Sequence, residues 1–517
     1  MVSAPVAPMQ SPRSAHASSE AGLGPWLGTA MVLLAGLAVA IAATFDQWLY
    51  FSLGVASLMF LVAALQKPYL GLLVWMFAFP VLDPYVRINL PGGVPDITMN
   101  RVAMALVVVS LMLAVMLRRR RLLPIGPIEG SMLLLSAIML GDIYLRSEST
   151  GEDVLLLLDE YLTPFLLFVA FKNLVASGAD VRKALLALAL SCLYLAPHGA
   201  YQFIMHSDPP FWIGPPDTVH SLVEEQGRAR GPFTDSVSYG ALGNMVFLSA
   251  LFLLGWSRKL SRRLLLTMLL VGAGSIVLLA LTRSVWLGLL VALMLAMVYE
   301  RRLRGIVLAL LLGGALTIGA GMLVLQDSAE TVSERATDYE TVYIRIALYN
   351  AALTMVMQQP LIGYGRHATE LFQRDRPKYV ADFMGIGAEW GILAGSPHNT
   401  LISMTLMYGV FGTLIYASIF VRIIRSINAL RRLKIDAPLP PSAYGSYLLT
   451  LTVIYVSVGM FTDVMAFNFF SNLYFMLAGG AEGLRIYYAS RAADGVPRGA
   501  VSPASVAMLA PPASGAA

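Results

Sequence analysis

The sequence predicts an all-α polytopic membrane protein with about fourteen transmembrane helices and a small helical cap on the outer side. Hydrophobic residues make up 57% of the 517-residue chain, charged residues only 13%, and the mean hydropathy is +0.70. These values exclude a soluble globular protein. The long unalternating runs of Leu, Val, Ala and Met indicate helices, because lipid permits only helices and closed barrels, whose backbone amides are all satisfied.

Apolar stretches of roughly the 20 residues needed to cross a bilayer recur along the chain. The predicted spans are Leu27–Ala43, Trp48–Leu65, Tyr69–Leu82, Met99–Leu117, Ile128–Leu145, Val154–Leu174, Lys183–Met205, Val237–Trp256, Leu264–Leu281, Val285–Tyr299, Gly305–Leu325, Leu401–Ile424, Tyr444–Phe461 and Phe467–Tyr487.

The spans divide the chain into five parts. Residues 1–25, rich in Ser, Ala and Pro, are expected to be a disordered cytoplasmic segment. Residues 26–325 carry spans one to eleven, residues 326–399 form the periplasmic cap, and residues 400–488 carry the last three spans. Residues 489–517 are expected to be a disordered cytoplasmic tail. Leu27–Ala43 lacks a nearby basic segment and a cleavage site, which indicates a retained helix rather than a signal peptide.

Basic loops determine the predicted sidedness. When the spans are threaded in order, six basic segments fall on one side, and the positive-inside rule makes that side cytoplasmic. They are Arg118–Arg121, Lys172–Lys183, Arg258–Arg263, Arg301–Arg304, Arg422–Lys434 and the residues after Arg485. These arginines also account for the net charge of +5 without nucleic acid. Both termini are then inside, and the cap faces the periplasm of a bacterial inner membrane.

The opposite side carries a few charges where the rule disfavours arginine. They are Arg228, Arg230, Arg283, Arg345 and Asp463. Arg283 lies in the tight turn Thr282-Arg283-Ser284 between two spans, where it either reaches lipid phosphates or binds an anionic ligand. The ligand is the interpretation we favour, because charges at the membrane edge are usually functional.

The cap, residues 326–399, is the part around which the predicted site is built. Arg345 lies in the helical run Asp338–Asn350, which is followed by the turn Gly363-Tyr364-Gly365 and by the re-entry segment Ser396-Pro-His-Asn399. Cys192 is the single cysteine, so the cap has no disulfide frame and must be held by packing. We expect the cap and the helix ends beneath it to form a polar pocket for a lipid-linked sugar.

The residue types in this pocket indicate phosphate recognition without a cofactor. Arginine is permanently charged, planar and rich in donors, as a diphosphate requires. The sequence shows no acidic cluster with metal-ligand spacing, no phosphate-binding loop and no dinucleotide motif, so no metal or cofactor is predicted. Arginines would then stabilise the charge of a leaving diphosphate.

Histidine and acidic residues leave alternatives open. His398 begins the Leu401–Ile424 span, where it either accepts a proton from a sugar hydroxyl or caps the helix through its backbone bonds. Spacing does not exclude four other histidines, namely His198, His206, His220 and His367. Asp159 and Glu160 lie inside a span, where they either pair with arginines or line the acceptor pocket.

Four motifs in order give the chain a resemblance to a family. They are Arg228-Ala-Arg-Gly-Pro-Phe-Thr-Asp235 with Tyr239-Gly240, then Leu281-Thr-Arg-Ser-Val-Trp-Leu-Gly288, then Arg345 before Pro360-Leu-Ile-Gly-Tyr-Gly365, and His398-Asn399 with Leu401. Over residues 227–472 the chain resembles the O-antigen ligase and polymerase superfamily, which includes Wzy-type polysaccharide polymerases, O-antigen ligases and protein O-oligosaccharyltransferases. It departs from the usual pattern by about two extra spans and by a charged segment between Pro377 and Trp390.

The resemblance implies a metal-independent, inverting glycosyltransferase that uses an undecaprenyl-diphosphate-linked glycan. Arg283 and Arg345 would bind the diphosphate and His398 would activate or orient the acceptor hydroxyl. Arg230 would support the donor end and Asp463 the pocket floor. The remaining expected substrate-binding residues are Arg228, Tyr364 and Asn399.

Polymerisation of lipid-linked repeats into a cell-surface or exopolysaccharide is the predicted function, with a chain-length regulator and a flippase as pathway partners. An O-antigen ligase, acting on lipid A-core or on protein, is the alternative within the family. A lipid-linked sugar transporter is the alternative from another class, whose signature would be an inverted repeat with broken helices at the membrane midplane. The sequence shows no such pairing, and its polar residues collect at one face.

Overall fold

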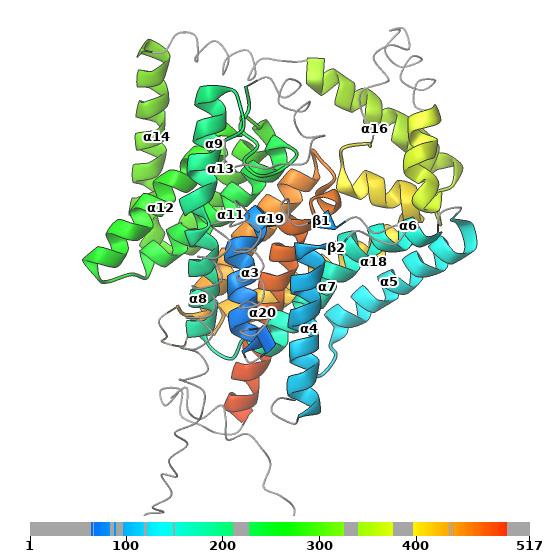
Figure 1. Ribbon diagram of the computed structural model, residues 1–517, viewed down its shortest axis with the longest axis horizontal. Coiled ribbons are helices and arrows are strands. Elements are labelled where there is room, and N and C mark those ends of the chain that lie inside the picture. Colours follow the sequence, from blue (N-terminus) through cyan, green and yellow to red (C-terminus); the bar gives the residue numbers. More distant parts are fainter. Residues whose placement is uncertain are drawn as a thin grey trace, which may run out of the picture. The chain divides into compact units, whose positions relative to one another are not determined.

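The computed structural model describes residues 64–65, 67–82, 87–88, 97–117, 121–147, 150–209, 227–324, 340–375, 396–433, 435, 437 and 439–493. All of them lie in one compact unit, Ala63–Ala517. Their secondary structure is helical apart from two short strands, β1 (Arg87–Ile88) and β2 (Ile97–Thr98), which pair antiparallel (Figure 1).

The first half of the described chain contains eight α-helices and a π-helical turn. They are α3 (Pro68–Leu82), α4 (Met99–Met116), α5 (Pro127–Arg146), α6 (Thr150–Leu157), η1 (Leu158–Leu162), α7 (Thr163–Leu174), α8 (Gly178–Leu190), α9 (Cys192–Met205) and α11 (Ser236–Gly255). The second half contains α12 (Leu260–Leu279), α13 (Arg283–Tyr299), η3 (Arg301–Leu303), α14 (Arg304–Val324), α16 (Glu340–Gln358), η4 (Gly365–His367), α18 (Thr400–Arg431), α19 (Pro441–Gly459), η6 (Val464–Ala466) and α20 (Asn468–Ala493).

The predicted spans correspond to helices wherever the structure describes them. Leu27–Ala43 lies outside the described residues, and of Trp48–Leu65 only residues 64 and 65 are described; every later predicted span contains a helix. Within the described ranges, 7 helices are long and apolar enough to cross a membrane, or 8 if α13 and the following helix, bent by 118°, form one span. The chain is thus a helical polytopic membrane protein, although these helices do not establish the predicted count of about fourteen.

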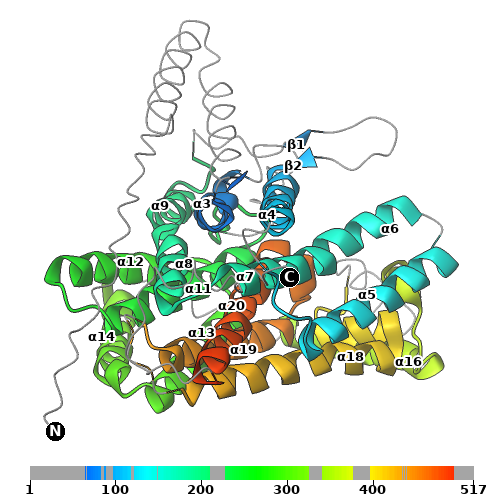
Figure 2. The same cartoon turned by 90° about the horizontal axis from the view of Figure 1, so that it is seen from below.

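Helix α11 is the central helix of this part of the fold, and α8, α12, α13, α19 and α20 pack against it (Figure 2). Its side chains from Ser238 to Leu254 are buried on all sides, which explains why its sequence is apolar without a polar stripe. Tight glycine contacts join the neighbouring helices. A Cβ on Gly479 of α20 would lie 2.1 Å from the Phe168 carbonyl of α7, so this helix pair requires glycine there.

Helix α18 is broken near its start. Gly409 has φ 63° and ψ −170°, and a Cβ there would lie 2.2 Å from the Leu361 carbonyl oxygen. The turn after α16 pairs with the break, because the Tyr364 amide donates to Leu406 and the Val410 amide donates to Pro360. The uninterrupted apolar run from Leu401 did not predict this break.

The described part of the cap, residues 340–375 and 396–399, packs around a hydrophobic core that it shares with Leu406 of α18. The buried residues of this core are Ala347, Leu348, Ala351, Ala352, Met355, Val356, Ala368, Phe372 and Leu406. The first six belong to α16, which confirms the predicted helical run through Arg345. The charged segment between Pro377 and Trp390 lies outside the described residues.

Candidate functional site

The turn between α12 and α13 places Arg283 at the first residue of α13. Leu281 has a positive φ of 45°, and the Thr282 hydroxyl donates to the Ala280 carbonyl at 2.9 Å. The indole of Trp286 donates to the Val277 carbonyl at 2.8 Å, which ties α13 to α12. Arg283 is therefore half-buried at a helix N-terminus, where the helix dipole adds to the positive charge available to an anion.

Arg345 on α16 lies close enough to Arg283 for the two charges to interact. Burial lowers the pKa of Arg345, and the neighbouring guanidinium of Arg283 lowers it further, against an opposing effect of Tyr349. Its guanidinium also stacks over the ring of Phe461, at 5.9 Å from the ring centroid. Two repelling cations in a half-buried position are an unfavourable arrangement that an anion between them would relieve.

Tyr349 ties the cap helix to two loops beneath it. Its hydroxyl donates to the Met460 carbonyl at 2.9 Å and lies 3.4 Å from the His398 carbonyl. The Asn399 amide donates to the same Met460 carbonyl at 3.0 Å. Arg345 and Tyr349 are one turn apart on α16, so the helix that carries the arginine is also fixed against the segment that carries His398.

His398 does not cap α18; Asn399 does. The Asn399 side-chain oxygen accepts from the amides of Leu401 at 3.0 Å and Ile402 at 3.1 Å. His398 precedes the cap with φ 53°, a left-handed conformation that is uncommon outside glycine and that often occurs at functional sites. The N-cap residue of α18 is therefore Asn399, and His398 is a half-buried residue directly before it.

Asp463 lies in the loop between α19 and α20, three residues after Met460. Its carboxylate accepts from the Met465 amide at 3.3 Å and caps the short helix η6. Burial raises the pKa of Asp463 and outweighs the lowering effects of that bond and of Arg366. The Thr400 hydroxyl donates to the Thr462 carbonyl at 3.1 Å, which holds this loop against the start of α18.

The predicted arginines of the 227–235 segment have different surroundings. Arg230 is 1% exposed, and its guanidinium forms an ion pair of 2.8 Å with Asp208. The Gln202 side chain binds the Arg230 amide, so this arginine is committed to holding the segment in place. Arg228 is half-buried beside Ala229, whose amide donates to the Leu279 carbonyl at 3.0 Å. Arg228 thus lies near the turn that carries Arg283.

The structure does not bring Tyr364 to the arginine pair. Its hydroxyl lies 3.1 Å from both the Met355 carbonyl and the Gln358 side chain, at the far end of α16. Ten residues separate Arg345 from Met355, which is about 15 Å along a helix. Tyr364 stabilises the turn that contacts the α18 break.

A second charged cluster surrounds Arg366 of η4. Its guanidinium forms an ion pair of 2.7 Å with Glu160 of η1 and lies 3.7 Å from Asp153. Asp159 pairs with Arg101 of α4. Asp159 and Glu160 thus each pair with an arginine. This is one of the two alternatives that the sequence left open for them. The sequence did not reveal their partners, because 58 and 206 residues separate the members of the pairs.

Tyr349 and Phe461 are the site residues that sequence reasoning missed. The spacing of Arg345 and Tyr349, one helical turn apart in a predicted helix, was the available signal for the tyrosine. For Phe461 the sequence held no signal, since its ring meets Arg345 only in the tertiary structure. Among the described residues, no group of three or more His, Cys, Asp or Glu side chains is placed to hold a metal ion.

These features define a class: a multi-pass helical membrane protein with a cationic site at the ends of its helices, under a small helical cap. Residues 268–417 match the sequence model of the family described as O-antigen ligase. The match confirms the resemblance to the O-antigen ligase and polymerase superfamily. It includes Arg283, Arg345, Tyr364, His398 and Asn399, whereas Arg228, Arg230 and Asp463 lie outside it. The chain has no match among curated proteins.

Proposed function

We propose that the protein is a membrane glycosyltransferase that polymerises undecaprenyl-diphosphate-linked oligosaccharide repeats at the periplasmic face of a bacterial inner membrane. The observation that carries the proposal is that two half-buried arginines from separate segments, Arg283 and Arg345, lie close enough to interact, and that Tyr349 ties the helix of Arg345 to the segment of His398. Such a pair suits a diphosphate, which bears several negative charges and accepts bidentate hydrogen bonds. The family match makes a lipid-linked glycan the expected source of that diphosphate.

In the proposed reaction an acceptor hydroxyl oxygen attacks the anomeric carbon of the donor sugar. The new glycosidic bond forms as the bond between that carbon and the diphosphate oxygen breaks, with inversion. His398 accepts the hydroxyl proton or orients the hydroxyl. Arg283 and Arg345 stabilise the charge that develops on undecaprenyl diphosphate as it leaves. No metal or cofactor takes part in this scheme.

The first test is substitution of the three central side chains. Arg283→Ala and Arg345→Ala should each lower polymer formation about 100-fold or more, because a transition-state charge loses its donor. His398→Ala should lower it by a similar factor. Arg283→Lys should also fail, since an ammonium cannot form the bidentate contact. Polymer length and yield would be measured in cells, with protein abundance in the membrane measured in parallel.

Arg374→Ala is the matched control, because Arg374 lies in the same cap but is 69% exposed and pairs with Asp375. It should leave polymer unchanged. Normal polymer in all three alanine variants, at normal protein abundance, would refute the proposed site.

Transfer to lipid A-core is the second candidate, because the matching family is described as O-antigen ligase. Purified protein would be incubated with a lipid-linked repeat, with and without a lipid A-core acceptor. Elongation of the repeat alone identifies a polymerase, and transfer that requires lipid A-core identifies a ligase. The break in α18 gives a transporter some support, and that alternative predicts movement of the repeat across vesicles without a covalent product.

A further inference from the structure

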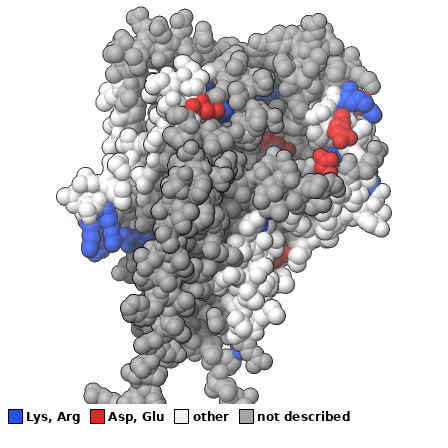
Figure 3. Space-filling model, viewed as in Figure 1, with Lys and Arg blue, Asp and Glu red and all other residues white. Residues whose placement is uncertain are grey.

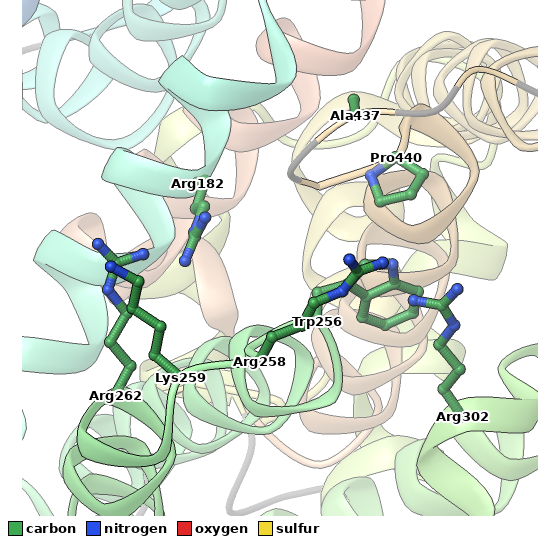
Figure 4. A pocket seen from close by; sticks show the side chains of 8 residues that line it. All are labelled: Arg182, Trp256, Arg258, Lys259, Arg262, Arg302, Ala437 and Pro440. Atoms are coloured by element: carbon green, nitrogen blue, oxygen red, sulfur yellow. The ribbon is translucent and has the colours of Figure 1, made fainter.

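A basic cavity of about 500 Å³ lies away from the candidate site. Its lining residues are Arg182, Trp256, Arg258, Lys259, Arg262, Arg302, Ala437 and Pro440. Arg182 comes from the start of α8, and Arg302 comes from η3. Figure 4 shows Arg182, Lys259 and Arg262 on one side of the cavity, and Arg258 and Arg302 beside Trp256 on the other. Five cations from three segments of the chain thus converge on one space.

No carboxylate lines this cavity among the described residues. Glu300 is an acidic neighbour of one lining cation, Arg302, and it also interacts with Arg431. The guanidinium of Arg302 lies over the Trp256 ring, 5.6 Å from the centroid, which fixes one cation at the edge of the cavity. A general excess of arginine on one side of a membrane explains the charges but not their convergence.

The cavity lies at the membrane surface opposite the candidate functional site. Helix α12 begins beside Lys259, and its other end leads into the turn that carries Arg283. Its 20 residues span about 30 Å, the thickness of the hydrocarbon core. Figure 3 shows basic side chains gathered at the α12 end of the molecule. The diphosphate proposed at the arginine pair therefore does not reach this cavity.

An exposed apolar face runs along α12 from the cavity. Leu260, Leu264, Met268 and Val271 are 72%, 63%, 56% and 66% exposed, and their spacing puts them on one face of the helix. Trp256 lies at the cavity end of this face, where an amphipathic ring suits the boundary between headgroups and acyl chains. A ligand with both a phosphate and an acyl chain fits this combination better than a soluble phosphate does.

We propose that this basic cavity binds the phosphate group of an anionic phospholipid, with its acyl chains along the exposed face of α12. Arg262 of α12 and Arg302 of η3 supply positive charge from the two sides of the cavity. The remaining cations favour a headgroup with net negative charge over a zwitterionic one. The bound lipid would join α12 to the start of α14 at the surface where α13 and α14 turn back on each other.

The test uses neighbouring arginines as a matched pair of double variants. Arg262→Gln/Arg302→Gln removes two lining cations, and Arg263→Gln/Arg301→Gln removes two exposed arginines at the same membrane surface that do not line the cavity. Both variants lose the same net charge. Binding of phosphatidylglycerol and phosphatidylcholine to the purified full-length chain in neutral detergent would be measured by native mass spectrometry. Glycerol phosphate and inorganic phosphate would serve as probes without acyl chains.

We expect the lining variant to bind phosphatidylglycerol about 30-fold more weakly, because each of the two lost lining cations contributes on the order of 1 kcal/mol to binding of the headgroup. The control variant should bind as the parent does, and Arg262→Lys/Arg302→Lys should retain most of the affinity. Equal losses in the lining and control variants would overturn the cavity as the site. Displacement of the lipid by glycerol phosphate or inorganic phosphate at similar concentration would overturn the choice of a lipid. Neither result bears on glycan transfer at the arginine pair.

Discussion

At the residue scale, the site depends on side chains that hold backbone as much as on those expected to touch substrate. Asn399 was predicted to bind substrate, yet its side-chain oxygen accepts two amides of α18 and its amide nitrogen donates to Met460. Those bonds place His398 directly before the helix. The side chain of Asn399 therefore acts on the site through the backbone on either side of it.

Substitutions of Asn399 separate the effect of capping α18 from the effect of the bond to the Met460 carbonyl. Asn399→Asp keeps the cap, because a carboxylate accepts from both amides, but it loses the donor to Met460. We expect Asn399→Asp to cost about 1 kcal/mol of unfolding free energy and Asn399→Leu about 2 kcal/mol or more. Thermal unfolding of the purified chain measures both. Equal stability of the Leu variant and the parent would contradict the assigned cap.

Asp463 makes stability depend on pH with a definite sign. Its raised pKa means that the folded chain holds this proton more tightly than the unfolded chain does. The stabilising contribution of that proton is complete below the ordinary value of 3.8 and is lost as the pH rises through the raised folded pKa. Asp463→Asn should therefore be more stable than the parent at pH 7, with the difference shrinking towards pH 4.

Thermal unfolding at both pH values measures this difference, and Glu370→Gln is the control, because the Glu370 side chain on the cap is 80% exposed. A larger gain from Asp463→Asn at pH 4 than at pH 7 would reverse the sign and contradict the burial of this carboxylate.

At the scale of elements, the helices were predictable and their interruptions were not. Long apolar runs located α5, the continuous span from α6 to α7, α11 and α12 to within a few residues, because burial in lipid constrains a helix throughout its length. The break at Gly409 arises where the turn after α16 supplies backbone partners, and the π-turn at Leu158–Leu162 carries Asp159 and Glu160, whose partners are side chains of other segments. Such partners are distant in sequence, so periodicity carries no trace of them.

Gly409→Ala tests the break in α18. A Cβ there would lie 2.2 Å from the Leu361 carbonyl oxygen, and φ 63° is strained for alanine. We expect a loss of about 2 kcal/mol or more together with reduced polymer, since the turn against this break anchors the end of α16. Gly314→Ala in α14, where nothing lies within 4 Å, is the control and should be neutral or slightly stabilising. Tolerance of both alanines alike would contradict the break.

At the scale of the whole molecule, the two proposed sites lie on separate surfaces with different chemistry. The arginine pair with the cap occupies one end of α12 and α13, and the basic cavity occupies the other end. The alternation of basic loops predicted that separation. The structure adds that Arg283, Arg345 and the segment of His398 meet through α16, although more than a hundred residues separate the first from the last.

Cysteine labelling tests this sidedness. Cys192 is the single cysteine of the chain, so the Cys192→Ser variant has no thiol and can serve as the parent for labelling. In that background Leu361→Cys, 58% exposed beside the cap, should react with a membrane-impermeant maleimide in cells whose outer membrane is permeable. Ser261→Cys at the exposed start of α12 should react only after the inner membrane is opened. Labelling of both from the same side would remove the basis of the proposed function.

The sequence alone determined that the chain is a multi-pass helical membrane protein, where most of its helices lie, and that arginines mark a side where they are disfavoured. Hydropathy and charge are properties of single residues, so they can be summed along the chain without knowing which residues are neighbours in space. Only the tertiary structure decided that Arg230 is committed to Asp208, that Asn399 caps α18, and that Arg345 meets Arg283 and Phe461. Each of these depends on contacts between distant segments, and contact geometry is a property of packing rather than of local sequence.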